Sequence, residues 1–133
     1  MVFGSSSGFS PSLDPSAFDG TSGFVINGVD SGDRSGRSVS GAGDVNGDGI
    51  DDLIIGAYVA DANGIDSAGE SYVVFGSNSG FSSSLELSTL NGSNGFVING
   101  ANDGDRIGRS VSGAGDVNGD GIDDLILGAP KGQ

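Results

Sequence analysis

The sequence contains no cysteine, no histidine and no tryptophan. Without cysteine there are no disulfides and no zinc-thiolate sites, and without histidine the commonest general base is missing. No other residue supplies a nucleophile-base pair or an acid with a reason for a raised pKa. The sequence therefore predicts that the protein is not an enzyme.

Basic charge is also scarce, since five Lys and Arg residues face eighteen Asp and Glu residues and the net charge is −13. A protein this acidic repels nucleic acid and anionic membranes and attracts cations. No run of about 18 apolar residues is present, so we expect no insertion into a membrane. The first residues, MVFG, carry neither a basic segment nor an apolar core, and so they predict no signal peptide.

Glycine is abundant instead, with 27 residues among 133, and this composition disfavours helices. The length suits one domain, which we place at residues 1–133. With no tryptophan, a core has to come from Val, Ile, Leu, Phe and small side chains that pack closely.

The chain is an internal repeat with a period of 72 residues. Residues 1–61 laid over residues 73–133 give 42 identities without insertion or deletion. The two units are therefore residues 1–72 and 73–133. The ends of the sequence fall inside a unit, so we expect a piece of a longer array or a designed repeat.

Each unit contains short apolar runs bounded by Gly, Asn, Asp and Ser, a pattern typical of strands. The runs are apolar at successive positions, so such strands have to be covered on both faces. Four strands in each unit favour a blade of a β-propeller. The alternative is a solvated linker, but a linker does not repeat LII, YVVF and FVI at fixed spacing. The apolar runs are DLIIGA (52–57), SYVVFG (71–76) and GFVING (95–100), and the fourth strand is GRSVSGAG (36–43), which has small residues around Val39.

We therefore predict an all-β fold with blades of four antiparallel strands and about two blades in each chain. One complete blade would span about residues 36–100. The first two strands of a second blade would lie in 108–129. Residues 1–28 would supply the fourth strand of a blade and the end of its third.

The stretch GDVNGDGIDDL occurs twice, at 43–53 and at 115–125. Its oxygen-bearing side chains stand at alternate positions, which suits calcium, an ion that takes six to eight oxygen ligands. The alternative is an acidic hairpin turn, since Asn-Gly and Asp-Gly form turns by themselves. Like charges this dense cost free energy without a cation, so we predict two calcium ions in each chain. The predicted ligands are Asp44, Asn46, Asp48, the Ile50 carbonyl and Asp52, and Asp116, Asn118, Asp120, the Ile122 carbonyl and Asp124.

The twelfth position of the loop distinguishes this motif from an EF-hand, which needs a bidentate acid there and a helix on each side. Ile55 and Leu127 hold that position, and a β-rich run follows. The ninth residue would then be the last ligand. We expect Asp51 and Asp123 to point away from the ion without coordinating it.

The loop D-x-N-x-D-G-x-x-D followed by LIIGA or LILGAP resembles the FG-GAP repeats of integrin α-subunit propellers and their bacterial relatives. The GAP element is intact at residues 128–130 and reads GAY at 56–58, whereas Ser35-Gly36 and Ile107-Gly108 stand in place of Phe-Gly. The resemblance implies that each loop joins the first and second strands of a blade and binds calcium. The near-identical units look more like a bacterial secreted array than an animal integrin.

The resemblance also implies an extracellular or cell-surface scaffold for interaction or adhesion. In the family the ligand-facing loops would be residues 28–36, 58–70 and 100–108 here. Asp33-Arg34 recurs in them as Asp105-Arg106, either for a ligand or as a turn held by a surface ion pair. A lectin-like propeller that binds a glycan is the alternative, with Tyr58 as its one aromatic platform, and an accessory segment of a secreted hydrolase is a third reading.

Finally, a repeat unit cannot cover its own apolar faces. The broken blades at the two ends are complementary, so we expect the chain to bind itself head to tail. Two blades in each chain allow six from a trimer or eight from a tetramer. The small residues of the inner strand favour the trimer.

Overall fold

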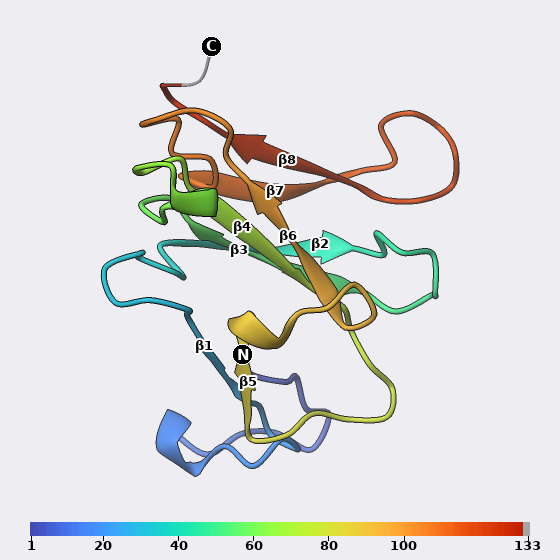
Figure 1. Cartoon of the computed structure of the whole chain (residues 1–133). Coiled ribbons are helices and arrows are strands. Elements are labelled where there is room, and N and C mark those ends of the chain that lie inside the picture. Colours follow the sequence, from blue (N-terminus) through green and yellow to red (C-terminus); the bar gives the residue numbers. More distant parts are fainter. Residues whose placement is uncertain (132–133) are drawn as a thin grey trace.

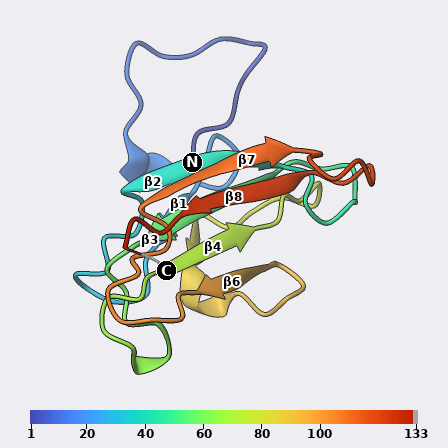
Figure 2. The ribbon, with the colours of Figure 1, turned by 90° about the horizontal axis from the view of Figure 1, so that it is seen from above.

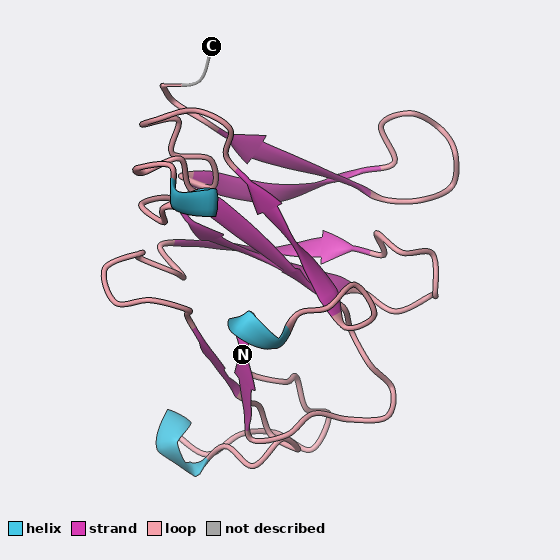
Figure 3. Cartoon of the chain, viewed as in Figure 1, coloured by secondary structure: helices cyan, strands magenta, loops and turns pink. Residues whose placement is uncertain are grey.

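Figure 1 shows the computed structural model of the chain, and residues 1–131 are described. Strands and loops make up nearly all of these residues, together with three single-turn 3-10 helices (Figure 3), so the all-β prediction is confirmed. Gln133, the last residue of the predicted domain, lies outside the described residues. The strands are β1 (Val25–Asn27), β2 (Ser38–Gly43), β3 (Asp52–Ala57), β4 (Glu70–Val74), β5 (Ser84–Glu86), β6 (Gly95–Asn99), β7 (Ser110–Gly115) and β8 (Asp124–Gly128), and the 3-10 helices are η1 (Pro15–Ala17), η2 (Ala62–Gly64) and η3 (Leu87–Thr89).

The central element is a four-stranded antiparallel sheet in the order β2-β3-β4-β6. Its four strands fall on the four strands predicted from the sequence, in the strand order of a propeller blade. β3 has the predicted bounds, whereas β2 begins two residues later than its run and β4 one residue earlier. A register shift between Gly41 and Gly43 marks the end of β2 that leads into the loop.

Both faces of this sheet are buried, as successive apolar positions predict. Ile54 and Ile55 are neighbours on β3 and point to opposite faces, where each joins a different core cluster. One cluster lies toward β1 and β5. The other lies toward the pair β7-β8. The sheet is thus the middle of three layers (Figure 1).

The pair β7-β8 repeats the pair β2-β3 of the central sheet, including the register and its shift, between Gly113 and Gly115. It packs beside β2, as Figure 2 shows from above. Val111 is buried there, and its N–H donates to Ser38 Oγ at 2.9 Å. The first two strands of the second blade therefore pack against the first strand of the central sheet.

Near the start of the chain, the third and fourth strands of a blade are represented by a few backbone hydrogen bonds and one isolated bridge. Met1 and Phe24 exchange two backbone hydrogen bonds of 3.0 and 3.1 Å, and Val2 forms a bridge with Gly23. Val74 pairs with Gly95 in the central sheet, 72 residues further on. The same strand pair is therefore present in both units.

One pairing was not predicted from the sequence. β1 and β5 form a two-stranded parallel sheet that joins the first broken blade to the central one. β5 reads Ser-Leu-Glu, a polar segment of three residues without the strand pattern. Its main chain pairs with the neighbouring unit, an effect that the residues of one segment cannot reveal.

We expect Ile54→Ala to destabilise the fold by about 3 kcal/mol, because it opens a cavity in the core between the two sheets. The control Ile54→Val keeps most of that volume and should cost about 1 kcal/mol. Urea unfolding of the two variants and the parent measures both free energies. Equal losses in the two variants would contradict the packing described for β3.

Candidate functional site

The two acidic loops join β2 to β3 and β7 to β8, and both extend from the same end of the sheets (Figure 1). Each loop reverses the chain with two glycines in the left-handed region. Gly47 has φ +76° and Gly49 has φ +82°, and the glycines of the second loop have similar angles. Only glycine adopts this conformation at little cost, so the two glycines fix the path of the loop.

Asp44 organises the first loop through its carboxylate. Its Oδ1 accepts hydrogen bonds from the N–H groups of Gly47 and Asp48 at 2.8 and 3.1 Å, and its Oδ2 accepts one from Gly49 at 2.7 Å. These donors, the Gly49 N–H above all, lower the pKa of Asp44 below its usual value. Asp116 accepts the same three bonds in the second loop.

Asn46 and Asp48 lie on the exposed rim of the loop. Asp48 Oδ1 accepts from the Ile50 N–H at 2.9 Å, and Asp48 Oδ2 lies 3.2 Å from Asn46 Nδ2. In the second loop Asp120 likewise accepts from the Ile122 N–H at 2.9 Å. These side chains are exposed to solvent.

Asp52 differs from the rim residues because it is 1% exposed. Its Oδ2 accepts from the Val45 N–H at 2.9 Å, and its Oδ1 accepts from the Gly76 N–H at 2.8 Å. Gly76 follows β4, so this carboxylate ties the loop to the third strand of the sheet. The equivalent Asp124 accepts from Val117 at 2.6 Å, within its own loop.

Within residues 1–131 the structure brings no three carboxylates into the arrangement of a metal site. The chemistry of the donors nevertheless fits a hard cation, since each loop offers three carboxylates, an amide oxygen and a main-chain carbonyl. The backbone N–H of Gly121 is the main cause that lowers the pKa of Asp116, and the Asp120 side chain contributes as well. The ten predicted ligands stay a prediction.

Asp123 has a structural role that the sequence did not reveal. Its carboxylate accepts from the Asp44 N–H at 3.0 Å, and its own N–H donates to the Asp44 carbonyl at 3.2 Å. Gly43 permits the approach, because a Cβ there would overlap the Asp123 carboxylate. The two acidic loops are therefore joined. A match between repeat positions gives no such signal, because this contact links position 44 of one unit to position 51 of the next.

The loops at the other end of the sheets also pack on one another. The N–H groups of Val59 and Arg106 donate to the carbonyls of Asp33 and Ser67 at 3.3 and 3.1 Å. Asp33 and Arg34 form no ion pair among the described residues, so that reading of the turn is wrong. Arg34, at φ +60°, donates to the Tyr58 hydroxyl at 2.7 Å instead.

Tyr58 is not a platform for a sugar, because it is 4% exposed. The guanidinium carbons of Arg34 and Arg109 lie 5.9 and 5.0 Å from its ring centroid. The hydrogen bond from Arg34 is the main cause that lowers the pKa of the Tyr58 hydroxyl. The residue therefore holds the loops together, which removes the feature on which a lectin-like reading depends.

Comparison with known proteins agrees with this architecture. The sequence profile of the FG-GAP repeat matches residues 35–74 and 107–133, which contain both acidic loops. The chain belongs to the FG-GAP repeat family. It is also similar to integrin alpha pat-2 of Caenorhabditis elegans, with 39% identity over 112 residues, or 81% of this chain. The aligned part spans 8% of the length of that relative.

These matches point to a protein family of the adhesion type. No helix among residues 1–131 is long and apolar enough to cross a bilayer. The positions of the loops agree with the family pattern, since each acidic loop joins the first and second strands of its sheet.

We expect Asp52→Ala to cost about 3 kcal/mol in buffer with a chelator, because two N–H donors would lose their charged acceptor in a buried place. Asp48→Ala, which removes an exposed carboxylate from the same loop, should change the free energy of unfolding by less than about 0.5 kcal/mol there. Urea unfolding monitored by circular dichroism compares the two. A similar loss in both variants would contradict the structural role of Asp52.

Proposed function

We propose that the protein is a calcium-stabilised propeller module that acts as an extracellular scaffold for interaction or adhesion. The observation that carries the proposal is the double occurrence of one folded loop with the same all-oxygen side chains. Membership of the FG-GAP family and the likeness to an integrin alpha chain add to it.

Each loop would hold one calcium ion through the ligands predicted from its sequence. The ion would supply positive charge among carboxylates that otherwise repel one another. The chain's own residues do the positioning: the glycines set the turn, and the Asp44 carboxylate gathers three N–H groups. Asp52 connects the loop to the third strand, so calcium would stabilise the sheet as well as the loop.

The partner would then bind at the opposite end of the sheets, where residues 28–36, 58–70 and 100–108 pack together. Because Arg34 and Arg109 cover Tyr58, these loops present no stacked aromatic surface. This favours a protein partner over a glycan. The scaffold would carry out no reaction of its own.

The expected affinity agrees with a location outside the cell. Calcium sites of extracellular modules have dissociation constants of roughly 0.1–1 mM. A site that weak would be empty at the calcium levels of a resting cytosol. The likeness to an integrin alpha chain supports the same location.

We expect the parent chain to bind about two calcium ions and to gain roughly 1.4 kcal/mol from each at ten times the dissociation constant. Asp48→Ala combined with Asp120→Ala should abolish the calcium-dependent rise in the melting temperature. Calorimetry and thermal unfolding across a calcium titration measure both effects.

The matched control, Asp30→Ala combined with Asp103→Ala, removes the same charge from the loops at the opposite end. It should keep the calcium response of the parent. If the loop double variant also kept the full response, the ligand assignment would be wrong.

A further inference from the structure

Equivalent residues of the two units differ sharply in exposure. Val111 is 9% exposed, but Val39, the same residue one unit earlier, is 63% exposed. Ile54 is fully buried, but Ile126, one unit later, is 62% exposed. Residue type and repeat position are the same in each pair, so the difference comes from the neighbouring sheet alone.

The buried members of these pairs meet in one place. Ile54 and Val111 belong to the core cluster between the central sheet and the pair β7-β8. This cluster is therefore the interface between one unit and the next inside the chain. Its four buried members are Ala42, Ile54, Val73 and Val111.

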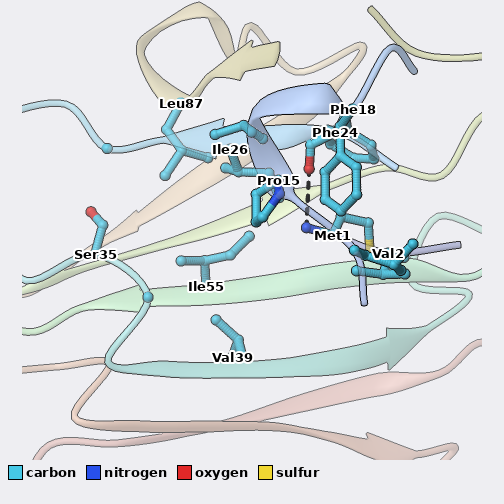
Figure 4. Close-up of a pocket in the computed structure, with 14 residues that line it drawn as sticks. Met1, Val2, Pro15, Phe18, Phe24, Ile26, Ser35, Val39, Ile55 and Leu87 are labelled. Atoms are coloured by element: carbon cyan, nitrogen blue, oxygen red, sulfur yellow. Dashed lines mark hydrogen bonds between the residues drawn. The ribbon is translucent and has the colours of Figure 1, made fainter. Parts of the chain in front are cut away.

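A groove lies on the opposite face of the central sheet, toward β1 and β5. It contains the equivalents of two of the four buried residues of this cluster. It measures about 440 Å³, and its lining includes Met1, Ile26, Val39 and Ile55 (Figure 4). Figure 4 shows Val39 and Ile55 on the sheet side of the groove, with Ile26 and Leu87 facing them. Met1 and Val39 are the equivalents of Val73 and Val111, one period earlier.

The two missing side chains are present at the far end of the chain. The equivalents of Ala42 and Ile54 are Ala114 on β7 and Ile126 on β8, and both are exposed. The groove lacks the side chains that the last strand pair presents to solvent. The groove and the strand pair β7-β8 thus carry the two halves of one interface. The chain already forms this interface once, between the central sheet and β7-β8.

We propose that a second copy of this chain covers each end, with β7-β8 of one copy seated in the groove of the next. Ile126 then packs on Val39 of the next copy, as Ile54 packs on Val111 within the chain. The contact rests mainly on apolar side chains, so we expect it to form with or without the calcium proposed above.

Aromatic residues support the same pairing independently. Phe24 and Phe81 stack between the first unit and the second, with ring centroids 4.3 Å apart and planes 11° apart. Their equivalents, Phe96 on β6 and Phe9, are exposed at opposite ends of the chain. Head-to-tail contact brings Phe96 onto Phe9 of the next copy and repeats the stack.

The partner copy also completes the second acidic loop. Within the chain, Gly76 donates its N–H to Asp52 after the third strand of the sheet. The equivalent acceptor is Asp124, and the equivalent donor is Gly4 at the head of the chain. Gly4 of the next copy then donates to Asp124 the hydrogen bond that Gly76 donates to Asp52 within the chain.

Such a contact is heterologous, since it joins different surfaces of identical chains, and it forms a ring where the rotation closes. Light scattering at micromolar protein should give about three or four times the 13.0 kDa of one chain. The particle should have the same mass in calcium and in chelator. This measurement therefore tests the assembly and not the binding of calcium. A folded particle with the mass of one chain would overturn it.

Two variants test the direction of the contact. Val39→Asp places a charge in the groove, and Ile126→Asp places one on the strand pair, both at positions that are exposed in a single chain. Each variant alone should stay at the mass of one chain. Mixed together they should form a dimer with one of each, because one keeps an intact strand pair and the other an intact groove.

Two controls keep the result specific. Val29→Asp, at an exposed valine outside the groove, should assemble like the parent. A mixture of Val39→Asp with the double variant Val39→Asp, Ile126→Asp should not associate, since no intact groove remains. Absence of the mixed dimer from two folded variants, or a dimer formed by either variant alone, would overturn the head-to-tail arrangement.

Discussion

A sheet that is apolar on both faces has to be covered on both faces, and this constraint governs the molecule. β3 carries Ile54 and Ile55 at adjacent positions, so no single additional layer can bury the central sheet. The chain meets the constraint by repeating itself, with the start of the first unit against one face and the strand pair β7-β8 against the other. Each layer that covers the sheet then presents an apolar face of its own. The apolar surface that still needs cover therefore lies at the two ends of the chain.

The acidic loops meet a different constraint. They reverse the chain between strands that carry small and apolar residues, and they do so with carboxylates that accept main-chain N–H groups. Asp44 holds the turn, and Asp52 reaches beyond it to the strand that follows. The charges that suit a cation are therefore also the framework of the loop. This dual use explains why the loop keeps its shape in two units whose surroundings differ.

Much of this architecture is visible in the sequence, because two strong signals coincide. The period of 72 residues and the apolar runs locate the strands, and β3 begins and ends where the run DLIIGA does. The parallel pair β1-β5 and the link between Asp123 and Asp44 could not be predicted in this way. Both are contacts between units, and on one side of each, at β5 and at Asp123, the residues look like ordinary loop residues within one unit. The cover over Tyr58 is hidden in the sequence for a related reason, since part of it comes from Arg109 of the other unit.

The link between the acidic loops has a thermodynamic consequence. Asp44 and Asp123 exchange two hydrogen bonds, so the main chain of one loop cannot shift without moving the other. Loops that are coupled in this way share the conformational entropy lost when either becomes ordered. Rigidity gained in one loop therefore lowers the entropic cost of ordering its neighbour. In a longer series of such units the same link would join each acidic loop to the next, so that ordering one loop would favour the ordering of its neighbours.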